Sequence, residues 1–430
     1  MSTLEFSIAF VLMIALMLLG LPIAVAMVLV GAGAGVMVFG VPFLSSTGAM
    51  LWGVLNDNLL TAAPLFILLG ELLLRSGMAD RMYGAMAAWL SRLPGGLLHT
   101  NIACCGLFAA TSGSSVATAA TIGTVALPSL QARNYPMPQA LGTLAAGGTL
   151  GILIPPSINM IVYGSLTENS IGKLFIAGIV PGLLLTGLFM AYVWINSRVT
   201  GKVPREELPP LRERLAMSVH LLPPLVIFGI IMGSLYTGFA TATESAALGV
   251  VVALFFTWRA GRLNWAMLET CFLQTARTTG MIMLILAAAF VLNLMISLAG
   301  VAETLTKSVT SLGLSATAML LVLIVFYLLL GMFMDVMSML VATVPITYPI
   351  VQALGVDPIW FGIFIILMCE LALITPPVGM NLFVVQGVRP DKGGIGDVIS
   401  GTWPYAVIML LFTLLLMAFP AIVTFLPGQM

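Results

Sequence analysis

The chain carries little charge. Only 7% of its 430 residues are Asp, Glu, Lys or Arg, whereas 60% are hydrophobic. A soluble globular chain has about 25% charged residues and could not bury this much apolar surface. The alternating segments of about ten residues that typify a transmembrane β-barrel are also absent. The composition therefore predicts an all-α polytopic membrane protein.

Residues for redox, metal or nucleotide chemistry are scarce. The four cysteines have no C-x-x-C spacing, and the two histidines stand alone at segment edges. An ATP-driven pump would need a GxxxxGK[ST] loop, which is missing. An intramembrane hydrolase with Ser114 as nucleophile would need a nearby base, and neither histidine lies at the polar centres of the interrupted segments. We expect no catalytic residue, no enzymatic activity, no cofactor and, with zero net charge, no nucleic-acid partner.

Long apolar runs define the crossings. The run from Thr3 to Val41 is too long for one crossing, and Gly20-Leu21-Pro22 at its middle predicts two helices. Residues 263 to 276 are more polar, so they predict an interfacial helix separate from the crossing at 278 to 299. All but two of the 16 Lys and Arg fall on one side, which predicts that this side is cytoplasmic.

The two halves of the sequence share a proline pattern. A shift of 221 positions superposes Pro128, Gln131, Ala132, Pro155 and Pro156 on Pro349, Gln352, Ala353, Pro376 and Pro377. The positive-inside rule makes the halves run through the membrane in opposite senses. We predict an inverted repeat over 1 to 197, a charged cytoplasmic linker over 198 to 217, and a second inverted repeat over 218 to 430.

Each half contains an apolar segment with a polar centre. Segment 97 to 132 carries Thr111-Ser112-Gly113-Ser114-Ser115, and segment 314 to 353 carries Asp335 and Ser338. Arms of about 15 residues are shorter than a full crossing. Two re-entrant helical hairpins are predicted, although two ordinary short helices per segment remain an alternative.

A Pro-Pro pair interrupts one apolar run in each half. Consecutive prolines remove two N–H donors, so the backbone unwinds near 154 to 159 and near 375 to 381. Unwound carbonyls can coordinate a hard cation, and the freed helix N-termini favour an anion. Asp335 has no basic neighbour in sequence, which suggests a bound cation; the alternative is that it caps a helix beginning at Val336, and the two roles are compatible. Glu370 could line the same cavity, whereas Glu71 and Glu244 are expected to bond helix to helix. Arg75 lies one turn after Glu71, so a pair between these two residues is the alternative for Glu71.

Several motifs resemble one family. They are SGSSVATAATIG from Ser112, GTLGILIPPS from Gly148, ITPPVGMNLFVV from Ile374, GMFMD ending at Asp335, and TESAALG around Glu244. This pattern, which covers essentially the whole chain, resembles the large membrane subunit of the tripartite ATP-independent periplasmic (TRAP) transporters.

The resemblance implies a sodium-coupled secondary transporter of the bacterial inner membrane, with an elevator-type motion and a small organic anion as substrate. It also implies two partners, a separate small four-helix membrane subunit and a periplasmic substrate-binding protein. A self-sufficient sodium/organic-anion symporter is the alternative function, and a channel is a further one. The identity of the substrate lies beyond the sequence.

The motifs also assign site residues. The sodium-binding set is Ser112, Ser114, Ser115, Ile154, Pro155, Ser157, Asn159, Asp335, Ser338, Thr375, Pro376, Gly379 and Asn381. The substrate-binding set is Ser114, Ser115, Asn159, Ser338, Glu370 and Asn381. Sodium is the only metal expected.

Overall fold

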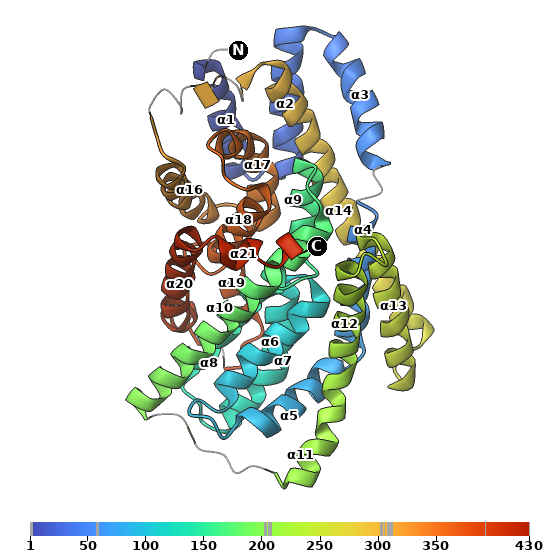
Figure 1. Cartoon of the computed structure of the whole chain (residues 1–430), viewed down its shortest axis with the longest axis vertical. Helices are drawn as coiled ribbons and strands as arrows, with labels where there is room; N and C mark the ends of the chain where they lie inside the picture. The colour runs from blue at the N-terminus through green and yellow to red at the C-terminus, as the bar shows by residue number, and fades with distance from the viewer. Residues whose placement is uncertain are drawn as a thin grey trace.

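The computed structural model describes residues 3–56, 60–201, 204, 209–301, 304, 306–307, 313–391 and 393–429. The elements of this part of the chain are all helical (Figure 1). Six of its helical spans are long and apolar enough to cross a membrane, or seven if the bent pair α4–α5 counts as one span. The prediction of an all-α polytopic membrane protein is confirmed.

Five helices form the N-terminal part of the chain that the structure describes, and the first two are separated at Gly20-Leu21-Pro22. Their bounds are α1 Thr3–Leu18, α2 Ile23–Phe39, α3 Pro42–Leu55, α4 Ala62–Arg75 and α5 Met78–Leu90. Gly20 takes a positive φ of 91° between α1 and α2, a conformation that glycine adopts without steric cost. The predicted division of the first apolar run into two helices is thus confirmed.

The central helices bring one hairpin and one interrupted helix. Their bounds are α6 Leu97–Ser112, α7 Ser115–Ala132, α8 Met137–Leu153, α9 Ile158–Thr167 and α10 Ile171–Thr200. The amide of Leu97, at the start of α6, donates to the hydroxyl of Tyr135, just beyond α7, at 3.1 Å. Both outer ends of the pair therefore meet, so α6 and α7 form an antiparallel hairpin.

The middle of the chain contains α11 Leu211–Ser218, a 3-10 turn at Val219–Leu221, α12 Leu222–Tyr236, α13 Ala242–Arg259 and α14 Trp265–Leu298. Residues 198 to 200 of the predicted linker continue α10, and 211 to 217 lie in α11; residues 202–203 and 205–208 lie outside the described part. The separate interfacial helix predicted over 263 to 276 is wrong. It continues into the crossing as α14, because no proline interrupts the sequence there and Gly280 is tolerated within a helix.

A second hairpin and a second interrupted helix follow. Their bounds are α16 Ala316–Gly331, α17 Val336–Ala353, α18 Pro358–Leu373, α19 Met380–Gly387, α20 Ile395–Ala418 and α21 Ala421–Thr424. The Tyr327 hydroxyl lies 2.7 Å from the Thr343 hydroxyl and 3.2 Å from that of Thr347. These residues lie at similar distances from the tip on the two arms, so this hairpin is antiparallel as well.

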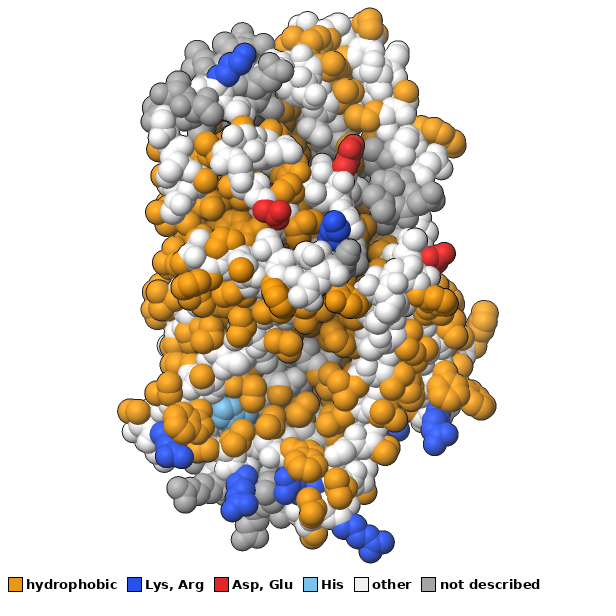
Figure 2. All heavy atoms as spheres, in the orientation of Figure 1, with side chains coloured by type: hydrophobic (Ala, Val, Ile, Leu, Met, Phe, Trp, Pro, Cys, Tyr) orange, Lys and Arg blue, Asp and Glu red, His pale blue; other side chains and the backbone are white. Residues whose placement is uncertain are grey.

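Packing places the interrupted elements in the interior. Helix α8 contacts α6, α7 and α20, while α14 contacts α2 and α4 on another side of the molecule (Figure 1). Figure 2 shows hydrophobic side chains across the middle of the molecule and most of the visible Lys and Arg at one end. This distribution agrees with a lipid-facing band and a cytoplasmic end.

Two acids bond locally, at their own helices. Glu71 pairs with Arg75 one turn later in α4, at 3.1 Å. Glu244 accepts from the Thr241 amide at 2.8 Å, and its own amide donates to the Thr241 hydroxyl, which together form a capping box at the start of α13. The pairing of Glu71 with Arg75 that the sequence offered is therefore confirmed, whereas the helix-to-helix bonds expected for both acids are wrong, since each acid bonds within or at the start of its own helix.

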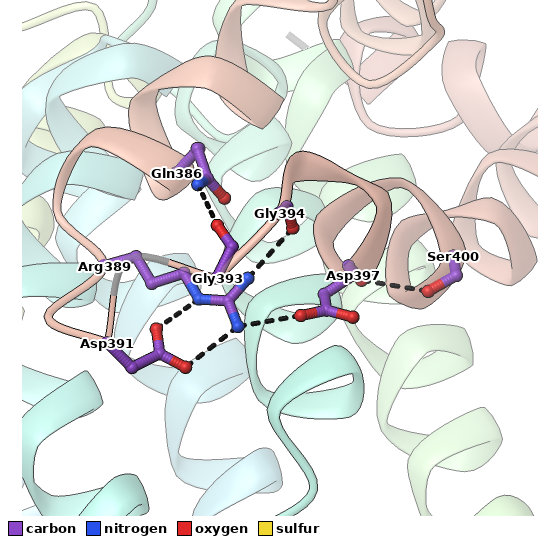
Figure 3. A network of polar contacts seen from close by, with 7 residues as sticks. All are labelled: Gln386, Arg389, Asp391, Gly393, Gly394, Asp397 and Ser400. Atoms are coloured by element: carbon purple, nitrogen blue, oxygen red, sulfur yellow. Dashed lines mark hydrogen bonds and ion pairs between the residues drawn. The ribbon is translucent and has the colours of Figure 1, made fainter.

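A buried arginine holds the turn between α19 and α20 (Figure 3). The Arg389 guanidinium donates to both carboxylate oxygens of Asp391, to Asp397 at 2.7 Å, and to the Gly394 carbonyl at 3.0 Å. Gln386 closes the turn by donating to the Gly393 carbonyl at 2.6 Å. The hydrogen bonds from Arg389 hold the pKa of the Asp391 carboxyl below its usual range.

This lowered pKa predicts a pH-dependent effect. A carboxyl whose folded pKa is lowered stabilises the fold above its unfolded pKa of about 4, and this contribution disappears as the pH falls through the folded value. Asp391→Asn should therefore lower the melting temperature at neutral pH, and its deficit relative to the native chain should shrink below about pH 4. Thermal unfolding across that pH range measures both, with the exposed Glu269→Gln as control. A deficit that does not vary with pH would contradict the assignment.

Candidate binding site at the hairpin tips

The first hairpin tip rests on the first interrupted helix. Gly113 has a positive φ of 62°, and a Cβ there would lie 2.9 Å from the Pro156 carbonyl oxygen. Ser114 caps α7 by accepting from the Ala117 amide at 3.4 Å. A Cβ on Gly151 would lie 2.7 Å from the Ser114 backbone. The backbones approach so closely here that these positions require glycine.

The first helix break spans Ile154 to Ser157, between α8 and α9. Pro155 and Pro156 occupy it and are joined by a cis peptide bond. Ser157 caps α9 by accepting from the Met160 amide at 3.4 Å. The Ser157 hydroxyl oxygen therefore satisfies one of the backbone amides that have no partner within α9, as capping residues do at other helix N-termini.

Asp335 forms the second hairpin tip. It caps α17, because its carboxylate accepts from the Ser338 amide at 3.2 Å and from the Ser338 hydroxyl. Phe333, two residues earlier, is 59% exposed, and Asp335 itself is exposed, so this tip lies at the surface of the chain. The cap and the charge thus coincide in one side chain.

The second helix break lies between α18 and α19 and contains the cis-linked Pro376 and Pro377. The Thr375 hydroxyl donates to the Leu371 carbonyl at 2.6 Å. Gly379 precedes α19 with a φ of 36°. Asn381 is fully buried, and its amide group donates to the Ala145 carbonyl of α8 at 3.3 Å. Its Oδ1 has no hydrogen-bond partner among the described residues.

A central cavity of about 200 Å³ joins both tips and both breaks. Its walls come from the starts of α7, α9, α17 and α19, from the ends of α8 and α18, and from α14. The lining residues are Gly113, Ser114, Ser115, Val116, Ile152, Ile158, Asn159, Thr278, Met281, Ile282, Asp335, Val336, Met337, Leu373 and Met380. Four helix N-termini therefore face one space, and Asp335 is its one acidic lining residue.

The cavity gathers part of the predicted site. Ser114, Ser115, Asn159 and Asp335 line it together, although they come from both halves of the sequence. Asp335 and Ser338 also line a neighbouring cavity of about 180 Å³ that reaches Leu21, at the α1–α2 break. The predicted residues that do not line the central cavity are Ser112, Ile154, Pro155, Ser157, Ser338, Glu370, Thr375, Pro376, Gly379 and Asn381.

Glu370 lies behind the first tip, fully buried in α18. Its carboxylate accepts from the Ser115 hydroxyl at 3.1 and 3.2 Å and from the Ile152 amide at 3.1 Å. Both donors belong to the first half of the chain. Glu370 thus connects the second interrupted helix to the first tip and to the last turn of α8.

The sequence did not predict the wall that α14 contributes to the central cavity. Thr278, Met281 and Ile282 lie one turn apart on a continuous helix. Nothing in their local sequence distinguishes them, because an unbroken apolar helix carries no sign of which face meets a cavity. Only the tertiary packing of α14 reveals this wall.

Comparison with known proteins places the chain in a family. Residues 10–422 match the family described as "Tripartite ATP-independent periplasmic transporter, DctM component". The chain therefore belongs to this family of large TRAP permeases, which are transporters rather than enzymes. The family resemblance inferred from the motifs is confirmed.

Individual proteins that are named as TRAP transporter permeases are similar to this chain. The C4-dicarboxylate TRAP transporter large permease DctM of Pseudomonas aeruginosa is 38% identical over 396 residues, covering 91% of this chain and 92% of its own. The isethionate permease DctMQ of Oleidesulfovibrio alaskensis is 33% identical over 85% of this chain and 58% of its own. The ectoine permease TeaC of Halomonas elongata is 31% identical over 96% and 97%.

A solved structure shares the fold. The YdaH transporter of Alcanivorax borkumensis aligns with a TM-score of 0.65 over 93% of this chain and 98% of its own, at 16% sequence identity. At this identity the likeness concerns the fold alone. The chain is thus a multi-pass membrane permease with a transporter fold.

The contacts of Glu370 generate a prediction. Glu370→Ala leaves the Ser115 hydroxyl and the Ile152 amide without their buried acceptor, which should destabilise the protein by about 1–3 kcal/mol. Glu370→Gln keeps a carbonyl oxygen for these donors and should cost much less. Thermal unfolding of the two purified variants tests this difference. Equal stability of the alanine variant and the native chain would refute the bridging role.

Proposed function

We propose that this chain is the transport subunit of a TRAP system that takes up a small organic anion, coupled to sodium, across the bacterial inner membrane. The observation that carries the proposal is the central cavity, where four helix N-termini and one carboxylate meet. Such a cavity offers one position suited to an anion and another suited to a cation. A transporter that couples an anion to a cation needs both.

The helix N-termini support an anionic substrate. The partial positive charge at a helix start favours a carboxylate or a similar group. The lining residues Ser115, Asn159 and Met380 lie within the first turns of α7, α9 and α19, whereas the start of α17 is already capped by the Asp335 carboxylate. Ser114 and Asn159 add side chains that can donate hydrogen bonds to such a group.

The oxygens near Asp335 support a hard cation. The Asp335 carboxylate borders two cavities, so a cation could reach it from either side. In the part of the chain that the structure describes, no Lys or Arg forms an ion pair with it. Asn381 Oδ1, which has no partner among the described residues, and the unwound carbonyls at both Pro-Pro pairs are oxygens of the kind that sodium prefers, but they lie outside the lining of the central cavity.

The two halves support an inverted repeat with an elevator-type motion. Each half has a hairpin followed by a helix interrupted at Pro-Pro, in the same order. Opposite orientations of the halves follow from the positive-inside rule. In this proposal, the unit of hairpins and interrupted helices moves against the helices that include α14.

The partners follow from the family. A small four-helix membrane subunit and a periplasmic binding protein would complete the system, and the DctMQ relative, of which this chain matches 58%, is named as a combined permease. The alternative is a self-sufficient symporter. The relatives' names include C4-dicarboxylate and isethionate, which are anions, and ectoine, which is zwitterionic.

Asp335→Asn tests the cation site. Asparagine also caps helices well, so α17 should persist while the charge is lost. We expect the sodium concentration for half-maximal uptake to rise about tenfold, which corresponds to one charge-assisted contact of about 1.4 kcal/mol. The matched control is Asp357→Asn, since Asp357 caps α18 by accepting from Trp360 at 2.8 Å outside the cavity. Unchanged sodium dependence of the Asp335 variant, at normal expression, would count against the proposal.

Reconstitution tests the tripartite arrangement. Liposomes containing this chain alone, with sodium outside, should not accumulate the substrate. Uptake should appear when the small membrane subunit and the binding protein are both added, with C4-dicarboxylate, isethionate and ectoine offered separately. Full uptake by the chain alone would instead establish the self-sufficient symporter.

A further inference from the structure

A cavity of about 290 Å³ lies apart from the central cavity. It forms where the chain bends by 69° between α4 and α5 and where α12 begins and α13 ends. None of the residues assigned above to sodium or substrate lines it. The transport function therefore leaves this cavity unexplained.

The charged side chains of its lining are both basic. Arg81 of α5 and Arg259 of α13 both line it, and His220 lies beside them. No Asp or Glu belongs to the lining. Over the described ranges, neither arginine forms an ion pair. Two guanidinium groups that share one cavity repel each other, and a bound anion would relieve that repulsion.

The rest of the lining is mainly apolar. Leu222 and Phe256 form part of the wall. The Ser76 hydroxyl is already engaged, because it donates to the Leu73 carbonyl at 2.7 Å and accepts from the Met78 amide at 3.2 Å. The cavity thus combines a cationic part with an apolar part and offers little neutral polar surface.

Its position matches the headgroup region of a bilayer. Trp258, next to Arg259, is 66% exposed, and Leu222 is 53% exposed. Tryptophan concentrates at the membrane interface, whereas exposed leucine at the start of an apolar helix contacts acyl chains. Both arginines belong to the side that the positive-inside rule places in the cytoplasm, where anionic lipids attract basic residues.

We propose that this cavity binds a phosphate-type anion, supplied by the headgroup of an anionic phospholipid. Arg81 and Arg259 would contact the phosphate from two different helices, and the acyl chains would run along Leu222 and Phe256. The same chemistry would also accept inorganic phosphate, so the experiment separates the two sources. A lipid held here would link the α4–α5 bend to α12 and α13.

Native mass spectrometry of the purified full-length chain tests the proposal, using phosphatidylglycerol and phosphatidylcholine with identical acyl chains. Each arginine near an anionic lipid contributes about 1 kcal/mol, so Arg81→Gln and Arg259→Gln should each weaken phosphatidylglycerol binding about fivefold, and the double variant about 25-fold. Arg92→Gln, an exposed arginine outside the cavity, is the matched control and should change nothing. Arg81→Lys keeps the charge and should retain most of the binding.

The outcomes separate the sources. Preference for phosphatidylglycerol that excess inorganic phosphate does not abolish supports the lipid. Binding of inorganic phosphate that depends on both arginines, with equal retention of the two lipids, supports the anion site but assigns it to free phosphate. Equal retention of both lipids without phosphate binding would overturn the proposal, as would a double variant that melts like the native chain and still prefers phosphatidylglycerol.

Discussion

The structure depends on one constraint, that backbone groups inside a membrane need partners within the protein. Lipid offers no hydrogen bonds, so a helix can break at this depth only where protein or a water-filled cavity supplies them. Ser114, Ser157 and Asp335 each cap the helix that starts after a break. The first tip and the first break are largely buried, whereas Asp335 and Pro377 of the second half are exposed, and the helix ends that flank all four breaks line one space. The central cavity therefore follows from this need for hydrogen-bond partners as well as from the proposed role in ligand binding.

Glu370 illustrates the same constraint for a side chain. A carboxylate removed from water is costly unless several hydrogen bonds replace its hydration. Glu370 receives them from Ser115 and Ile152, which lie at the first tip and in the last turn of α8. Because the donors and the acceptor come from opposite halves of the chain, the cost of burying this acid is offset only when the two halves are correctly packed. The acid thus makes the two interrupted units interdependent.

The breaks could be predicted from the sequence, whereas their surroundings could not. Pro-Pro pairs and the Gly113-Ser114 tip act locally, so their effect on the backbone does not depend on what packs nearby. The unbroken α14 was divided wrongly, since local polarity at 263 to 276 does not end a helix. The partners of Glu370, 255 and 218 residues away, could not be predicted, and neither could the place of Thr278 in the cavity wall, because contacts between distant segments leave no local signal. The sequence patterns thus predicted the hairpin tips but not the cavity wall contributed by α14.

The two hairpin tips solve one structural problem with different chemistry. Ser114 and Asp335 lie 221 positions apart, the same separation that relates the Pro-Pro pairs, and each caps the second arm of its hairpin. Either residue type satisfies the amides of a helix start. Only Asp335 adds a charge, and the cavity between the tips therefore has a neutral hydroxyl on one side and a carboxylate on the other. If capping were the whole requirement, serine would suffice at both tips; the charge at one of them is the feature that a cation-coupled transporter needs and a purely structural turn does not.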